Sequence, residues 1–503
     1  MEQQAEHKAQ SDTVTAAGAI HEVVNVVNVV IIGSGFSGLC MAIRLKQAGI
    51  DDFVILERDA QFGGTWRVND YPGCGCDVPS HLYSFSFAPN PNWSRKFARR
   101  DELWAYTRSL VQQFDLARHI RTNSALISAR FDEPTAQWQV QTASGGMRCK
   151  SLVSAIGPLS QPRMPDLPGL AEFTGKTLHT AQWDSGWDAR GQRVAVIGTG
   201  ASSIQLIPQL VDKVARLDVY QRTAPWILPR MDRAISAPER WLFKRLPLLQ
   251  KLVRGWIYCT FEMRLLAFAK YRSLTTVMRW AGMFNIRRGI KDPLLRAKVT
   301  PNFIPGCKRV LLANDYYPAL AQPQVEVIPL AVQAIRANAV VDAHGQAREV
   351  DAIIFATGFD VEHAVASLNL QGRNGQTLAG VAQGGLEAYK GVALPGFPNF
   401  FMIAGPNTGL GHNSMIYMIE SAVEYVLQAV QLLRQTPTLE VKSQVSHTYN
   451  QQIQYRLQGT VWNSGCKSWY LSASGKNYTL WPGFTFEYRR ITRQFDRDAY
   501  LAD

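Results

Sequence analysis

The pattern of hydrophobic and polar positions predicts two separate strand–turn–helix–strand units. In the first, a β-branched run over 23–32 is typical of a buried strand and stops at Gly33. An amphipathic helix is predicted over 37–47, and a second apolar run covers 53–56. This order is the repeating unit of a doubly wound parallel sheet, in which ligands bind at the turn after the first strand.

The second unit begins at Arg193, with a strand, a turn and a helix followed by a further strand, predicted over 194–197, 198–200, 201–210 and 217–220. A Pro-rich stretch over 157–169 is a candidate domain linker. Further strands and one long helix are predicted over 325–328, 352–355 and 415–433. We therefore expect an α/β fold with two Rossmann-like dinucleotide-binding domains and, over 238–298, a helical insertion rich in aromatic and basic residues.

Composition narrows the class of protein. A chain of 503 residues with 46% hydrophobic residues should form several domains with ordinary cores. No continuous apolar run is long enough to span a membrane, and the polar leader over 1–26 does not resemble a secretory signal. The seven cysteines form no CxxC pair or metal-ligand spacing, so we expect reduced thiols, no bound metal and a cytoplasmic location.

Two glycine-rich turns carry the predicted chemistry. Gly33-Ser-Gly35-Phe36-Ser-Gly38 follows a strand and opens a helix, and Glu57 ends the next strand, where an acid binds ribose hydroxyls. Gly198-Thr199-Gly200-Ala201-Ser202-Ser203 repeats the arrangement without its third glycine, and Arg222 stands where an arginine accommodates the 2′-phosphate of NADP. Two dinucleotide sites in one chain indicate a flavin and a nicotinamide. Two more glycine-rich turns, over 356–360 and 405–411, could line a cofactor or be ordinary turns.

Between the two turns, the residues Phe173, Gly175, His179, Trp183 and Asp184 match every fixed position of F-x-G-x-x-x-H-x-x-x-W-[PD]. This is the fingerprint of the Baeyer–Villiger monooxygenases. The segment 63–73 and the Ala-Thr-Gly-Phe-Asp turn over 356–360 also resemble that family, and the resemblance covers about 29–488. It implies a discontinuous FAD domain (1–158 and 385–503), an NADP domain (159–223 and 308–384) and a helical insertion (224–307).

The resemblance also implies the activity and the cofactor contacts. NADPH would reduce FAD, O2 would add at the flavin C4a, and the resulting peroxide would attack a ketone to give an ester or lactone. The implied FAD contacts are Gly33, Gly35, Phe36, Gly38, Glu57, Arg58, Gly64, Thr65, Trp66, Tyr71, Asp77 and Tyr83. The implied NADP contacts are Gly198, Thr199, Gly200, Ala201, Ser202, Arg222, Thr223 and Lys308.

The catalytic residues that the resemblance implies are Arg309 and Asp77. A peroxide anion and a developing alkoxide both need a fixed positive charge in a dry site, which arginine supplies at any working pH. A buried arginine needs a carboxylate partner, and Asp77 would provide it. Arg309 could instead only contact a phosphate. His179 could be chemical or could orient the linker between domains, and Trp183 is expected to pack.

The C-terminal aromatic residues are predicted to close over an apolar substrate, with ordinary packing as the alternative; they are Trp462, Trp469, Tyr470, Trp481 and Phe484, of which Trp462, Trp481 and Phe484 are the predicted substrate contacts. Which ketone is used stays open: linear, cyclic, aryl and steroid ketones all remain candidates, and no oligomeric state is predicted. A rival function is a flavin monooxygenase that oxidises nitrogen or sulfur, but its fingerprint normally lacks the Trp-[PD] ending.

The net charge of +13 is regional, because residues 230–298 hold 16 Lys and Arg against 4 Asp and Glu. The sequence pattern argues against a nucleic-acid partner, since zinc-finger spacing and RNA-binding aromatic motifs are both missing, and we expect none. Contact with an anionic membrane is the stronger alternative. We favour packing of the apolar face on the NADP domain, with the charge guiding an anionic cofactor. The residues concerned are Trp241, Phe243, Leu246, Leu248, Leu249, Trp256, Ile257 and Tyr258.

Overall fold

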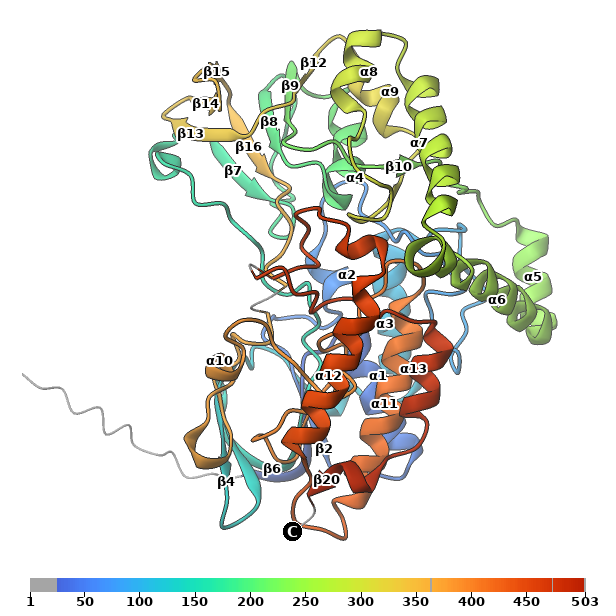
Figure 1. The fold of residues 1–503 in the computed structure, drawn as a ribbon, viewed down its shortest axis with the longest axis vertical. Coiled ribbons are helices and arrows are strands. Elements are labelled where there is room, and N and C mark those ends of the chain that lie inside the picture. Colours follow the sequence, from blue (N-terminus) through green and yellow to red (C-terminus); the bar gives the residue numbers. More distant parts are fainter. Residues whose placement is uncertain (1–24, 362–363, 473, 502–503) are drawn as a thin grey trace, which may run out of the picture.

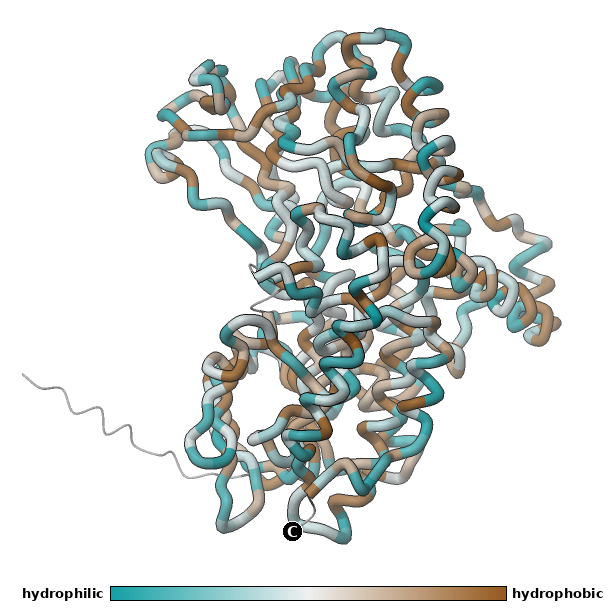
Figure 2. The backbone as a smooth tube through the Cα atoms, in the orientation of Figure 1, coloured by the Kyte–Doolittle hydropathy of each residue, from teal (hydrophilic) through white to brown (hydrophobic). Residues whose placement is uncertain are grey.

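The computed structural model describes residues 25–361, 364–472 and 474–501, so most of the polar leader lies outside the described residues. Two sheets lie at opposite ends of the molecule, and a group of helices projects to one side (Figure 1). Hydrophobic positions concentrate in the strands and in the helices that cover them (Figure 2). In the described part of the chain, no helix has the length and apolar character needed to cross a membrane.

The larger sheet has the order β17-β4-β5-β6-β1-β2-β3, with β18 beside β6. β1 pairs in parallel with β2 and β6, whereas β4, β5 and β6 form an antiparallel meander. The strands are β1 (Asn25–Ile32), β2 (Phe53–Leu56), β3 (Ile120–Arg121), β4 (Leu126–Asp132), β5 (Gln137–Thr142), β6 (Gly145–Ser154), β17 (Leu370–Gln371) and β18 (Phe400–Met402).

Successive residues of β1 enter two different cores. Val29 lies among the helices on one face of the sheet, and Val30 lies in a second core with the meander on the other face. Because both faces are covered, the strand is β-branched throughout rather than alternating with polar residues. On the first face α1 contacts α3 and α11, and α11 contacts α13. These helices are α1 (Phe36–Gln47), α3 (Arg100–Gln113), α11 (Met415–Leu432) and α13 (Thr485–Thr492).

The smaller sheet is all parallel, with the order β12-β9-β8-β16-β7, and confirms the second predicted unit. Its elements are β7 (Lys176–His179), β8 (Arg193–Ile197), α4 (Ala201–Leu210), β9 (Arg216–Tyr220), β12 (Val325–Ile328) and β16 (Ala352–Phe355). An antiparallel sheet is formed by β13 (Val332–Arg336), β14 (Ala339–Asp342) and β15 (Ala347–Glu349). The strand β17 pairs with β4, so the chain re-enters the larger sheet by residue 370. This is earlier than the domain boundary expected at 385.

The insertion is helical, as predicted, and two short paired strands join its ends. Its elements are β10 (Ile227–Leu228), α5 (Ala237–Arg245), α6 (Pro247–Glu262), α7 (Thr275–Gly289), α8 (Pro293–Val299) and β11 (Leu311–Leu312). The remaining elements are α2 (Thr65–Val68), α9 (Tyr316–Leu320), α10 (Leu378–Val381), β19 (Glu440–Val441), α12 (Ser443–Gln458) and β20 (Tyr500–Leu501).

The favoured interpretation, that the apolar face packs on the NADP domain, was wrong. Phe243 and Ile257 are buried, but α5 and α6 pack on the predicted FAD domain, where Phe243 packs edge-on against His81 and Tyr258 stacks on Tyr417. Other large side chains project into solvent because each helix has more apolar positions than its inner face can cover: Trp241, Leu246, Leu248 and Trp256 are all more than half exposed.

Candidate active site

A cavity of about 1770 Å³ runs between the two sheets. The turns after β1 and β8 both line it, as do both further glycine-rich turns, over 356–360 and 405–411. All of the predicted NADP contacts and all of the predicted FAD contacts except Gly38 lie on its wall. The fold therefore brings together residues that are far apart in the sequence.

The turn after β1 has the shape that a dinucleotide site needs. Gly33 has a φ of +103°, which favours glycine. A Cβ on Gly38 would lie 1.9 Å from the Gly33 carbonyl oxygen, so helix α1 can approach the strand only without a side chain here. Glu57 follows β2 and accepts hydrogen bonds from Ser34, which places its carboxylate on the cavity wall. These residues fit the pyrophosphate and ribose of FAD.

The turn after β8 leaves space where the first turn does not. A Cβ on Gly198 would lie 2.5 Å from the Ala356 carbonyl oxygen, whereas a Cβ on Gly200 would meet nothing within 4 Å. The open side of Gly200 at the start of α4 fits a second pyrophosphate. Arg222, after β9, and Lys308 line the same cavity, and burial followed by the charge of Arg222 lowers the pKa of Lys308. Two neighbouring cations fit a 2′-phosphate.

Replacing Arg222 with alanine should raise KM for NADPH about 10- to 100-fold, the size of one lost charged hydrogen bond, and leave KM for NADH unchanged. Because the pKa of Lys308 is lowered, the preference for NADPH should also fall as the pH rises through that pKa, below the range of an ordinary lysine. Steady-state kinetics with both coenzymes measure this. Arg190→Ala, at an exposed position of the same domain, is the control. Equal losses with NADH would contradict the assignment.

Arg309 and Asp77 form an ion pair on the cavity wall. Arg309 Nη2 and Nε donate to the same Asp77 oxygen at 2.6 and 3.2 Å. The Asp77 carboxylate raises the pKa of Arg309 against the effect of burial. Burial alone would raise the pKa of Asp77, but the charge and hydrogen bonds of Arg309 hold it below its usual value. A permanent positive charge is thus fixed beside the cavity.

The fingerprint residues support the linker rather than lining one pocket together. A Cβ on Gly175 would lie 2.4 Å from the Asp351 carbonyl oxygen, so only glycine fits beside β16. His179 ends β7 and is buried, its Nδ1 accepts a hydrogen bond from the Ala181 backbone N–H at 3.0 Å, and burial lowers its pKa. Asp184 pairs with Lys176 at 2.6 Å. Phe173 packs in the core of the smaller sheet, and Trp183 packs edge-on against Trp187 while also touching the cavity.

Of the five C-terminal aromatic residues expected to close over the substrate, Trp469 alone lies on the cavity wall. Trp462 and Trp481 are almost fully buried, and Phe484 stacks on Phe486; none of the three belongs to the cavity wall. Trp469, from the same segment, does line the cavity. Its neighbour Tyr470 is buried close to Arg309, and burial raises the pKa of Tyr470 to about 12, so the phenol stays neutral.

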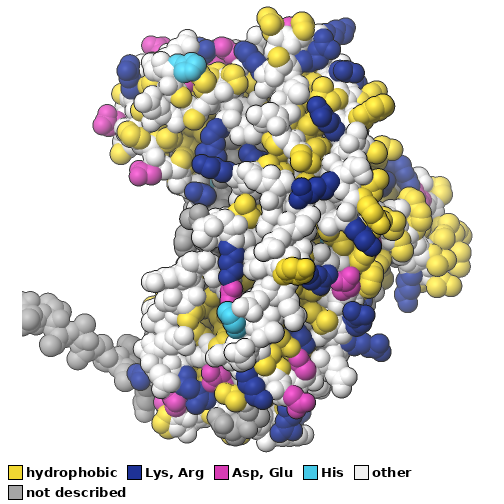
Figure 3. All heavy atoms as spheres, viewed as in Figure 1, with side chains coloured by type: hydrophobic (Ala, Val, Ile, Leu, Met, Phe, Trp, Pro, Cys, Tyr) yellow, Lys and Arg dark blue, Asp and Glu magenta, His cyan; other side chains and the backbone are white. Residues whose placement is uncertain are grey.

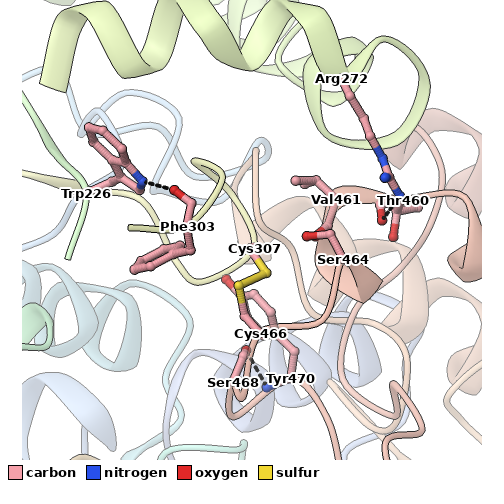
Figure 4. Close-up of a disulfide and its surroundings, with 10 residues drawn as sticks. All are labelled: Trp226, Arg272, Phe303, Cys307, Thr460, Val461, Ser464, Cys466, Ser468 and Tyr470. Atoms are coloured by element: carbon pink, nitrogen blue, oxygen red, sulfur yellow. Dashed lines mark hydrogen bonds between the residues drawn. A yellow bond between two sulfur atoms is a disulfide. The ribbon is translucent and has the colours of Figure 1, made fainter. Parts of the chain in front are cut away.

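The expectation of reduced thiols was wrong at two positions. Cys307 and Cys466 form a disulfide, with their Cα atoms 6.0 Å apart (Figure 4). Cys307 directly precedes Lys308 and Arg309, and Cys466 lies three residues before Trp469. The bond therefore fastens the C-terminal segment to the backbone that carries the two cations. Cysteines 159 residues apart gave no spacing signal in the sequence.

Replacing Cys466 with serine, or reducing the disulfide with dithiothreitol, should lower the free energy of unfolding by about 2–4 kcal/mol, because the unfolded chain regains the entropy of a long loop. It should also raise KM for NADPH, since the segment after Cys466 is no longer held beside Lys308. Denaturant unfolding and kinetics measure both effects. Cys259→Ser, at an exposed free thiol, is the matched control. A loss of stability on reduction that persists in Cys466→Ser would contradict this.

A contact that the sequence did not predict joins the two nucleotide units. Gln205 of α4 accepts a hydrogen bond from the Tyr71 hydroxyl at 2.9 Å and from the Gly75 backbone at 3.2 Å, and donates to the Gly75 carbonyl. A Cβ on Gly73 would lie 2.3 Å from the Gln205 carbonyl oxygen, so the segment passes close to the helix. No local pattern could have paired residues so distant in sequence.

Comparisons with known proteins agree with this geometry. A family model described as pyridine nucleotide-disulphide oxidoreductase matches residues 30–242. A Baeyer–Villiger monooxygenase of Pseudomonas aeruginosa is 50% identical, over 98% of this chain and 93% of the relative. One of Streptomyces coelicolor is 47% identical, over 94% and 92%.

Solved structures give the same result. A steroid monooxygenase bound to NADP has a TM-score of 0.85 at 28% identity, covering 95% of this chain and 99% of that one. A cyclohexanone monooxygenase of Rhodococcus sp. Phi1 bound to NADP+ has a TM-score of 0.85 at 27% identity, with the same coverage. With the fingerprint, the two nucleotide turns and relatives similar along almost their whole length, the chain belongs to the Baeyer–Villiger monooxygenase family.

Proposed function

We propose that this chain is an NADPH- and O2-dependent flavoprotein that converts an apolar ketone to an ester or lactone. The observation that carries the proposal is the Arg309–Asp77 pair on the wall of a cavity that both nucleotide turns also line. The reaction balances as ketone, O2, NADPH and a proton giving ester, NADP+ and water. Bound FAD supplies the chemistry of hydride acceptance and oxygen activation.

The residues of the chain would bind the two cofactors, orient them and supply a fixed positive charge. Glu57 would hold the ribose of FAD, and Arg222 with Lys308 would hold the 2′-phosphate of NADPH, since all three side chains line the cavity. Arg309 lines the cavity, so its guanidinium would stabilise negative charge that develops on the oxygen atoms of the reacting groups. Asp77 keeps that guanidinium in one orientation through two hydrogen bonds. His179 is a positioning residue that fixes the end of β7 beside the 356–360 turn.

An apolar ketone suits the remaining wall of the cavity. Leu410, Met415 and Ile419 line it together with Trp469. We assign the aromatic substrate contact to Trp469 in place of Trp462, Trp481 and Phe484, because it alone of these four side chains reaches the wall. The relatives' names cover both steroid and cyclohexanone monooxygenases, so ring ketones belong in a substrate screen.

A cytoplasmic location goes with the proposed use of NADPH. Disulfides are uncommon in that compartment, so the redox state of Cys307 and Cys466 in freshly lysed cells is a direct check. Alkylation of free thiols during lysis, followed by mass spectrometry, would report it.

A panel of linear, cyclic, aryl and steroid ketones tests the function. NADPH consumption should be matched by ester or lactone formation, mole for mole, for at least one class. Amines and sulfides in the same panel test the rival oxidation of nitrogen or sulfur. NADPH consumption with hydrogen peroxide as the only product across the ketones would contradict the proposal.

A further inference from the structure

The helical insertion presents a surface that the nucleotide site does not use. We call it the aromatic–basic face. Its three tryptophans Trp241, Trp256 and Trp280 are 60%, 66% and 76% exposed. Among the described residues, 12 of the 22 exposed large hydrophobic side chains lie between Trp241 and Leu294. Yellow side chains gather over the projecting helices, with blue ones among them (Figure 3).

Each helix turns one side inward and one outward. On α6, Leu248, Leu252 and Trp256 repeat every four residues and are all exposed, whereas Ile257 and Phe261 are buried. On α7, the exposed outer residues are Val277, Trp280 and Phe284. The inner residues of α7 are Gly282, Asn285 and Ile286, all buried. The exposed residues therefore form continuous stripes rather than scattered positions.

The inner side is firmly attached, so the outer side is a preformed surface. Arg254 donates to the carbonyl oxygens of His81 and Ser84 at 2.6 and 2.8 Å. Gln250 donates to the Asn90 carbonyl at 2.7 Å. Asn285 of α7 donates to the carbonyl oxygens of Ile227 and Ala313.

The cations of this face are not neutralised by the acids of the insertion. Asp232 pairs with Arg95, and Glu239 pairs with Arg233. Glu262 is buried and accepts hydrogen bonds from Asn413 and Thr485. Asp292 caps α8. The exposed cations around the stripes are Lys244, Arg245, Lys251, Arg279, Arg287, Arg288 and Lys291.

We propose that the aromatic–basic face binds peripherally to the surface of an anionic lipid bilayer. Tryptophan is favoured at the boundary between headgroups and acyl chains, because its ring is apolar and its N–H is polar. Lysine and arginine beside it meet anionic headgroups. A second copy of the chain fits this face less well, because two sets of unpaired cations would repel each other. A nucleic-acid site would present mainly basic residues, whereas exposed leucine and tryptophan dominate here.

Flotation of the FAD-loaded protein with vesicles tests this at low salt. With vesicles of phosphatidylcholine and phosphatidylglycerol in a 3:1 ratio the protein should float, and with phosphatidylcholine alone it should largely stay behind. Neutralising Lys244 and Lys251 to glutamine should each weaken binding about fivefold. Trp256→Ser with Trp280→Ser should abolish it. Tyr455→Ser, an aromatic residue 77% exposed on α12, is the matched control.

Bound FAD and circular dichroism in each variant establish that the fold is intact. Equal binding to both vesicle types, or binding unchanged in the double tryptophan variant, would overturn the proposal. So would a dimer, detected by light scattering without lipid, that the tryptophan variant dissociates, because the face would then be occupied by a second copy.

Discussion

Replacing Arg309 with alanine should lower the rate of ester formation by about 10²- to 10³-fold, while FAD reduction by NADPH stays within about tenfold of the wild-type rate. Removing one fixed electrostatic partner of a developing oxyanion has an effect of roughly this size. Hydride transfer to the flavin does not develop that charge, so it should be spared. Anaerobic stopped-flow absorbance measures the first step, and product chromatography measures the second.

Two variants sharpen this test. Arg309→Lys keeps a charge but loses the two hydrogen bonds to one Asp77 oxygen, so it should recover only part of the activity. Asp77→Asn should destabilise the fold, since it leaves Arg309 without its countercharge. Because the pKa of Asp77 is lowered in the folded state, the stability it contributes is present above its unfolded pKa and is lost as the pH falls through the folded one. Full ketone turnover in Arg309→Ala would refute the assignment.

Replacing Gly38 with alanine should prevent FAD binding and lower the melting temperature by several degrees or leave the protein insoluble. The added Cβ would lie 1.9 Å from the Gly33 carbonyl oxygen, and backbone atoms cannot move aside without separating α1 from β1. An overpacked core costs about 1–3 kcal/mol, occasionally more, and here it also deforms the turn that faces the pyrophosphate. The ratio of flavin absorbance to protein absorbance measures cofactor content.

Gly255→Ala is the matched control, because its Cβ would meet nothing within 4 Å on helix α6. It should retain FAD and melt at the same temperature or slightly higher, since alanine favours a helix. Gly200→Ala is a second comparison: its Cβ also meets nothing, so FAD should stay bound and only NADPH affinity should fall. Normal FAD content in Gly38→Ala would contradict the role given to this glycine.

Predictions of local structure succeeded where one short-range pattern fixed an element. The strands β2, β12 and β16 and the helix α4 have the predicted bounds. Helices α3, α12 and α13 were not predicted, because their apolar positions are sparse and each is held by contacts with distant elements. The meander of β4, β5 and β6 was also missed, although β5 alternates strictly between half-buried and buried residues, a pattern that is typical of a strand.

The part of the site that consists of recognisable sequence motifs could be predicted. The glycine turns, Glu57, Arg222 and the Arg309–Asp77 pair all lie around one cavity. The role of Gln205, the choice of Trp469 over Trp462, and the disulfide depend on which distant segments meet. The exposure of Trp241 and Trp256 could not be predicted either, because an amphipathic pattern marks the apolar side of a helix without saying what covers it.

The disulfide determines which part of the chain can be stretched when a force is applied to the two termini. Cys307 and Cys466 close a covalent ring that contains β12 and β16 of the smaller sheet and β18 of the larger one. A force applied to the termini passes across the bond and leaves the ring slack. About 159 residues, on the order of 50 nm of extended chain, are thereby shielded from stretching until the bond is cut. One covalent bond therefore protects strands of both nucleotide-binding domains from stretching.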